Sequence, residues 1–268
     1  MFNLLRMDLR RLVRSRSFYI TLLVTAVMVA LVTLMAVTMS DPEFLDAMEA
    51  KGAEISAYDR QMGEFIRDID QLTFAHEVFR SGFLLLVTGI CVAVFFSQDF
   101  TNGFIKNIGI SGPSRKAYVL EKAAFIGLYS GTLTALAVGM ALLAPVCMGL
   151  ILRANTLVDI LQYTLFLWLP HWAFGIMALF MVLLSRNSTL GIIVSLASAL
   201  GLTAALSDVL PHLLHLSSPS PYFLCNIVQN QCLPQAYPAE IQMVVLCAAG
   251  WGLVYTAGSL LIMEKRDI

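Results

Sequence analysis

Six long apolar segments divide this chain, and they constrain its fold more than any other feature. Of its 268 residues, 58% are hydrophobic and 13% are charged, whereas a soluble domain has about 45–50% apolar and about 25% charged residues. A helix needs about 20 apolar residues to cross a bilayer. We therefore predict an all-α integral membrane protein, a single domain over residues 1–268 with six transmembrane helices. They span approximately residues 18–39, 79–97, 123–152, 160–184, 189–206 and 241–263.

The lysines and arginines predict how these helices are oriented. With both termini in the cytoplasm, the cytoplasmic segments carry twelve Lys and Arg residues and the outer segments carry five. Positively charged residues accumulate in cytoplasmic loops. We therefore predict a multi-pass protein of the bacterial plasma membrane with both termini inside.

The N-terminal residues 1–17 predict a basic amphipathic helix, because apolar residues recur there at helical spacing. Its arginines are Arg6, Arg10, Arg11 and Arg14. Such a helix lies in the membrane interface with its arginines near anionic lipid headgroups. The alternative is a simple positively charged flank that only fixes the orientation of the first transmembrane helix.

The acidic segment 40–78 predicts a helical extracellular insertion between the first two transmembrane helices. Apolar residues recur every seven positions, at Met48, Ile55, Met62 and Ile69. This repeat indicates a helical seam that packs on a second copy, on a partner, or back on this chain. Alternatively, Gly52 and Gly63 break the segment into shorter helices. The segment has either a structural role or a role in substrate capture.

No motif of a nucleotide-binding or hydrolytic enzyme is present in the sequence. It contains no Gly-x-x-x-x-Gly-Lys-Ser/Thr, His-Glu-x-x-His or Gly-x-Ser-x-Gly. Its histidines and cysteines follow no zinc-binding pattern. We predict that the chain is not an enzyme, holds no metal or cofactor of its own, and does not bind nucleic acid.

His171 is the one histidine inside a predicted transmembrane helix, and it follows Pro170. An ionisable residue at membrane depth is a candidate functional site. Alternatively, a neutral imidazole is the hydrogen-bond partner of the Phe166 carbonyl, which Pro170 leaves without its helical donor.

The last outer segment, residues 207–240, contains the only two cysteines outside the predicted transmembrane helices, Cys225 and Cys232. We predict an extracellular loop, partly re-entrant, in which these cysteines form a disulfide in an oxidising compartment. In reducing surroundings the two thiols stay free.

A short polar segment, residues 98–122, separates the second and third predicted transmembrane helices. It contains Asp99, Gly103, the turn at residues 113–115, Tyr118 and Lys122. This pattern resembles the acid-x-x-x-Gly, Pro-x-x-Arg and Lys signature of the membrane subunit of type-2 ABC exporters. Here Arg115 follows Pro113 one position closer than in that signature. The basic N-terminal helix and the charged C-terminal tail are also similar to that family.

The resemblance implies a permease subunit of an ATP-driven exporter. Two permease subunits, identical or different, would enclose a path, and two separate cytoplasmic ATPase subunits would bind ATP and Mg²⁺. Residues 1–17 would form a connector helix, and residues 98–122 a coupling loop on the ATPase. The expected contact residues are Asp99, Gly103, Phe104, Ile105, Ile108, Arg115, Lys116 and Lys122.

The substrate class implied by this family is amphipathic or hydrophobic, which covers peptides, lipids and drugs. Two other functions remain open from the residues alone. One is a membrane binding or immunity protein without transport, and the other is a proton-coupled carrier that uses His171.

Overall fold

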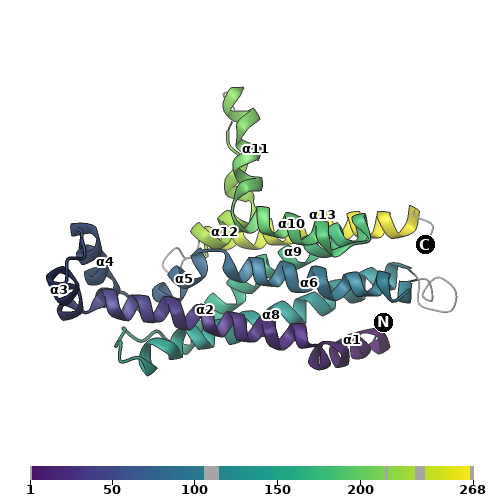
Figure 1. Ribbon diagram of the computed structural model, residues 1–268. Helices are drawn as coiled ribbons and strands as arrows, with labels where there is room; N and C mark the ends of the chain where they lie inside the picture. Colours follow the sequence, from purple (N-terminus) through teal and green to yellow (C-terminus); the bar gives the residue numbers. More distant parts are fainter. Residues whose placement is uncertain (1, 106–114, 215–216, 233–238, 266–268) are drawn as a thin grey trace.

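A computed structural model describes residues 2–105, 115–214, 217–232 and 239–265 of the chain. These residues form helices and short connections, with no β-strand among them (Figure 1). The helices are α1 (Phe2–Arg14), α2 (Arg16–Ser40), α3 (Pro42–Ala50), α4 (Ala57–Asp68), α5 (Gln71–Arg80), α6 (Phe83–Thr101), α8 (Arg115–Cys147), α9 (Leu157–Ser185), α10 (Ser188–Ala199), α11 (Leu202–Leu213), the 3-10 helix η1 (Ser220–Tyr222), α12 (Leu224–Asn230) and α13 (Ala239–Lys265).

Five of the described helices, α2, α6, α8, α9 and α13, are long and apolar enough to cross a membrane. They run along a common axis in Figure 1. Helices α10 and α11 reach this length only as a pair, which makes the number of candidate spans five or six. The prediction of an all-helical chain with several long apolar helices is confirmed.

The prediction of one continuous helix over residues 189–206 is wrong, because two helices cover this segment. Helices α10 and α11 meet at an angle of 74°, and α11 projects away from the other helices in Figure 1. Gly201 at the break has φ +77°. Glycine enters this left-handed region without a Cβ clash, so it ends α10 after Ala199.

Helix α9 lies at the centre, packed against α6, α8, α10, α12 and α13. Its contact with α8 depends on Trp168 and Trp172, whose rings stack with centroids 5.4 Å apart. The indole N–H of Trp168 donates to the Gly127 carbonyl at 2.9 Å, and that of Trp172 to the Ala123 carbonyl at 2.8 Å. An added Cβ at Gly127 or Gly131 would lie 3.1 Å from these rings. The two glycines therefore allow the close approach of α8 and α9.

The segment between α2 and α6 folds into three short helices, so the predicted seven-residue repeat does not form one continuous seam. Helix α3 ends at Ala50 and is capped by Lys51, and Gly52 follows with φ +90°. Helix α4 begins with a capping box, in which Ser56 and Asp59 satisfy each other's backbone N–H groups. Arg60 of α4 holds the two helices together through Asp46 at 2.9 Å and Glu49 at 2.6 Å.

Gly63 brings α4 against the end of α2. A Cβ at this position would lie 2.2 Å from the backbone oxygen of Met39. Backbone atoms cannot move aside as a flexible side chain can, so we expect Gly63→Ala to push α4 off α2. The expected cost is about 1–3 kcal/mol, as for other overpacked contacts. The unfolding temperature of the purified chain in detergent measures it.

Gly139→Ala is the matched control for this prediction. Gly139 lies within α8, and a Cβ there would meet no atom within 4 Å. Alanine is the better helix former, so this control should keep or raise the unfolding temperature. Equal unfolding temperatures for the two variants would show that the contact between Gly63 and Met39 does not hold α4 in place.

Candidate functional site

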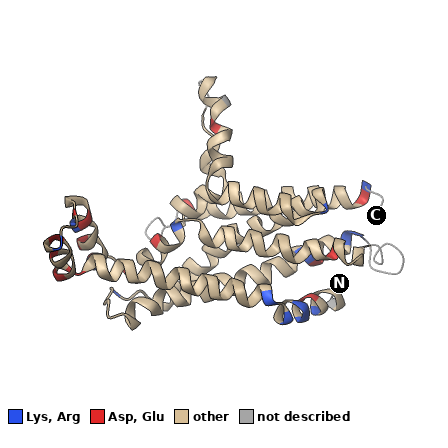
Figure 2. Ribbon diagram, viewed as in Figure 1, with Lys and Arg blue, Asp and Glu red and all other residues tan. Residues whose placement is uncertain are grey.

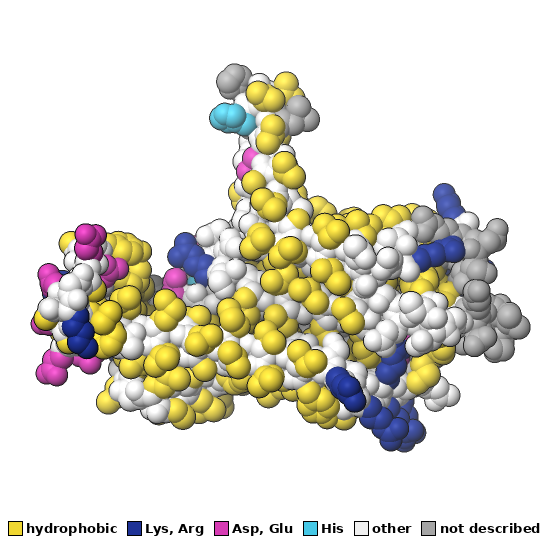
Figure 3. Space-filling model, viewed as in Figure 1, with side chains coloured by type: hydrophobic (Ala, Val, Ile, Leu, Met, Phe, Trp, Pro, Cys, Tyr) yellow, Lys and Arg dark blue, Asp and Glu magenta, His cyan; other side chains and the backbone are white. Residues whose placement is uncertain are grey.

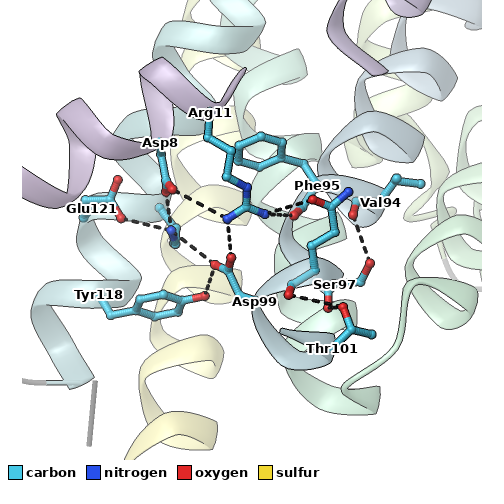
Figure 4. Close-up of polar contacts among 11 residues, drawn as sticks. Asp8, Arg11, Val94, Phe95, Ser97, Asp99, Thr101, Tyr118 and Glu121 are labelled. Atoms are coloured by element: carbon cyan, nitrogen blue, oxygen red, sulfur yellow. Dashed lines mark hydrogen bonds and ion pairs between the residues drawn. The ribbon is translucent and has the colours of Figure 1, made fainter. Parts of the chain in front are cut away.

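A cluster of charged side chains lies inside the protein where α1, α6 and α8 meet (Figure 4). Helix α1 contributes two residues three positions apart, α6 one residue in its last turn, and α8 three of its first eight residues. We call this set the charge cluster. Its members are Asp8, Arg11, Asp99, Tyr118, Glu121 and Lys122.

Asp99 receives hydrogen bonds from two different helices. Its Oδ1 accepts from Arg11 Nη1 of α1 at 2.5 Å, and its Oδ2 accepts from the Tyr118 hydroxyl of α8 at 2.9 Å. The ammonium nitrogen of Lys122 lies 3.3 Å from the same Oδ2. The side chain of Asp99 is therefore surrounded by two cations and a phenol.

Lys122 is the centre of the cluster, because its ammonium contacts all three carboxylates. It donates a hydrogen bond to Asp8 Oδ2, and its Nζ lies 3.4 Å from Glu121 Oε2. The side chains of Lys122, Asp8, Asp99 and Glu121 have no solvent exposure. Charges removed from water in this way need partners, and each of these has at least one.

Aromatic rings form the apolar wall of the cluster. The Nζ of Lys122 lies 4.8 Å from the ring centroid of Tyr118 and 5.0 Å from that of Phe96. The guanidinium of Arg11 lies 4.3 Å from the ring centroid of Phe95 and donates to the Phe95 carbonyl at 2.6 Å. These faces attract cations and exclude water, which strengthens the ion pairs.

The cluster holds three carboxylates against two cations. Among the described residues, Asp8 Oδ1 and both carboxylate oxygens of Glu121 have no hydrogen-bond partner. Burial raises the pKa of Asp8 above its ordinary value, although the nearby Lys122 opposes this shift. Lys122 contacts all three carboxylates, so removing its charge would leave Arg11 as the one cation of the cluster.

Three of the predicted ATPase-contact residues are buried inside the chain and do not lie on its surface. Asp99 is 1% exposed, Lys122 0% and Ile105 2%. Asp99 and Lys122 are buried because they pair with each other and with Arg11 and Asp8 of α1. A side chain enclosed in this way cannot touch a separate subunit in this structure.

The remaining predicted contact residues lie near the surface or outside the described residues. Gly103 has φ +67°, as expected for a tight turn after α6, and Phe104 is half-buried. Arg115 donates to the Met263 carbonyl of α13 at 3.1 Å. Lys116 is exposed, with its Nζ 3.7 Å from Glu264. Ile108 lies outside the described residues.

The N-terminal helix is confirmed as an amphipathic helix, with one correction to its arginines. Arg6, Arg10 and Arg14 are exposed, as a helix in the membrane interface requires. Arg11 instead turns inward to Asp99. Asp8 and Glu121 also belong to the charge cluster but were not predicted from the sequence. The signal for Asp8 was an acid three residues before Arg11, on the apolar side of this helix. The signal for Glu121 was its position directly before Lys122.

His171 is fully buried in α9. Its Nδ1 donates to the Leu167 carbonyl at 2.6 Å, so it does not bond the Phe166 carbonyl. That carbonyl, which Pro170 leaves without its helical donor, instead receives the thiol of Cys232 at 3.8 Å. His171 Nε2 has no hydrogen-bond partner among the described residues. No hydrogen bond or ion pair joins His171 to the charge cluster among the described residues.

Cys225 and Cys232 are free thiols, so the predicted disulfide is not formed. Cys225 lies in α12, which runs from Leu224 to Asn230, and Cys232 follows the end of this helix. From Cys225 to Asn230 the helix rises about 7.5 Å, whereas the Cα atoms of a disulfide lie about 4.4–6.8 Å apart. Helix α12 thus carries the chain away from Cys225 before Cys232 is reached.

No family model and no curated protein matches this chain. The described residues also contain no group of His, Cys, Asp and Glu side chains that could hold a metal ion. The charge cluster offers no exposed nucleophile. What its arrangement can do is join three helices firmly at one end of the molecule.

Proposed function

We propose that this chain is the membrane-spanning subunit of an ATP-driven exporter. It works with a second permease subunit and two separate ATPase subunits, which supply the ATP and Mg²⁺ sites that its sequence lacks. One observation carries the proposal. Asp99, Tyr118 and Lys122, the signature residues on either side of segment 106–114, converge on one another and on Arg11 of α1.

This convergence suits the transmission of force. Segment 106–114 joins α6 to α8, so a push on it moves the ends of both helices. Through Arg11 and Asp8, the charge cluster makes α1 move with them. Helix α1 leads directly into α2, whose first turn is capped by Ser15. Because removing one partner of a buried ion pair is costly, the ends of α1, α2, α6 and α8 move as one body.

In this proposal the end that carries α1 and both termini faces the cytoplasm. Figure 2 shows Lys and Arg residues gathered at this end and Asp and Glu residues gathered on α3 and α4 at the opposite end. The exposed Arg6, Arg10 and Arg14 then lie level with anionic lipid phosphates. Helices α3, α4 and α5 form the extracellular insertion.

Site-specific photocrosslinking from Lys116 tests the proposed partner. Lys116 lies in the first turn of α8, two residues after segment 106–114, and its side chain is 65% exposed. We expect a benzophenone side chain at this position, in cells that make the chain naturally, to crosslink a protein whose peptides include a P-loop. The same group at Leu136, exposed in the middle of α8, is the control and should crosslink lipid or another membrane subunit.

Two outcomes would contradict the proposal. One is a crosslink from Lys116 to lipid alone. The other is a purified complex without any P-loop protein, which would favour a binding or immunity protein without transport, or a proton-coupled carrier.

A further inference from the structure

An apolar groove opens between α2, α4 and α5, at the end of the molecule opposite the charge cluster. Its volume is about 720 Å³, within the range of pockets that bind small molecules. We call it the outer groove. Six of its apolar lining residues are Met35, Met39, Met62, Phe65, Ile66 and Phe74.

A second cavity, about 750 Å³ in volume, continues from the outer groove. Gln61, Phe65 and Ile69 line both cavities. We call the second one the acidic cleft, because three carboxylates line it and only one cation, Arg153, does. The carboxylates belong to Glu64, Asp68 and Asp70.

The cation of the acidic cleft is already engaged. Arg153 Nη2 lies 3.6 Å from Asp68 Oδ1, and the guanidinium also donates to the Asp68 carbonyl. Asp70 accepts from the Thr73 N–H as the cap of α5. Glu64 forms no ion pair with any described residue. The cleft therefore keeps a negative charge that a ligand can neutralise.

The surroundings add to this charge. Residues 41–80 contain ten Asp and Glu residues against four Lys and Arg residues, a net charge of −6. Figure 3 shows acidic side chains gathered at this end beside the hydrophobic surface of the helices. In a symmetric dimer joined through this surface, two identical acidic patches would face each other and repel. A cationic ligand suits the surface better than a second copy does.

We infer that the outer groove and the acidic cleft together bind a lipophilic organic cation. The apolar body lies in the outer groove, and the cationic group lies in the acidic cleft near Glu64. Three methionines give the groove a soft, adaptable wall, and Phe65, which lines both cavities, is an aromatic ring that a cation can contact. The claim that this cation is a transported substrate rests on the proposed function. The claim that the cation binds here does not, because binding requires no ATPase.

Equilibrium dialysis of the full chain in nanodiscs of neutral phosphatidylcholine tests this inference. The probe is tetraphenylphosphonium, and the control is tetraphenylborate, which has the same shape and the opposite charge. After subtraction of empty nanodiscs, we expect saturable binding of the cation and none of the anion. Salt should weaken the binding, because Glu64 and its neighbours are exposed.

Two variants connect this binding to the site. Glu64→Lys should weaken cation binding about tenfold at low salt, as expected for reversing one charge about 6 Å away in water. Glu43→Lys makes the same change of net charge on α3, outside both cavities, and should change binding less than about twofold. Met62→Trp should fill the outer groove and abolish binding, with the unfolding temperature kept.

The inference would be overturned if nanodiscs that contain the chain retained no more of either ion than empty nanodiscs do. Cation binding that is unchanged in both Glu64→Lys and Met62→Trp would also overturn it. So would the absence of cation binding in a chain that forms a dimer which Met62→Trp dissociates, because a second copy would then occupy the groove. If the crosslink from Lys116 to a P-loop protein survives while cation binding is absent, only the ligand assignment fails, and the proposed function stands.

Discussion

Replacing Lys122 by methionine is expected to destabilise the folded chain by about 3–5 kcal/mol, the usual cost of removing one partner from a buried ion pair. The substitution leaves Asp8, Asp99 and Glu121 buried with Arg11 as the one remaining cation of the charge cluster. Methionine fills similar volume, so a loss of packing would not explain the effect. The fraction of chain that survives heating as a monodisperse species in mild detergent measures it.

Two controls make this prediction specific. Lys116→Met removes a lysine from the exposed surface of the same helix and should leave the unfolding temperature unchanged. Glu121→Gln should be neutral or stabilising, because the carboxylate lacks a hydrogen-bond donor among the described residues and adds to an excess of negative charge. If Lys122→Met unfolds at the same temperature as Lys116→Met, the charge cluster does not hold the three helices together.

Substituting Arg11 by glutamine is expected to loosen α1 from α6, while Asp8 still ties α1 to α8 through Lys122. Asp99 loses its 2.5 Å bond to Arg11, and the Phe95 carbonyl loses its donor, but Tyr118 and Lys122 remain on Asp99. The hydrogen bonds of a charged group contribute about 1.5–3 kcal/mol each. Backbone amides of α1 should therefore exchange hydrogen faster, by about ten- to a hundredfold, with little change in α6.

The functional consequence follows from the proposed transmission of force. In Arg11→Gln, the ATPase should still bind and hydrolyse ATP, but α1 and α2 should follow α6 less tightly, so transport should fall. Arg10→Gln changes an exposed neighbour on the same helix and serves as the control. Unchanged exchange in α1 of Arg11→Gln would contradict the role assigned to this ion pair.

The long helices could be predicted from the sequence because their signals are local. A run of about 20 apolar residues fixes a candidate span by its length alone, and the spacing of arginines and leucines fixes α1. The break between α10 and α11 could not be predicted in this way, because Gly201 is one of several glycines in apolar segments and only its φ distinguishes it. The seven-residue repeat after α2 predicted one continuous helical seam for a similar reason, because the repeat does not show that the helix breaks at Gly52.

The candidate site was located by its signature residues but assigned the wrong environment. Asp99 and Lys122 stand beside a polar segment, which suggests exposure. Their main partners, Arg11 and Asp8, lie 88 and 114 positions away in the sequence. A pairing of that range depends on how α1 packs against α6 and α8, which no local pattern shows. The same holds for Cys232, whose thiol reaches the carbonyl of a residue 66 positions away.

ATP hydrolysis by the complex that is purified through this chain from its own membrane is the most direct test of the proposed function. We predict hydrolysis that co-elutes with the chain and with a protein containing a P-loop. It should persist in the Arg11→Gln variant, whose defect lies between α1 and α6. A chain that elutes as a folded complex without hydrolysis and without any P-loop protein would contradict the claim that an ATPase drives it.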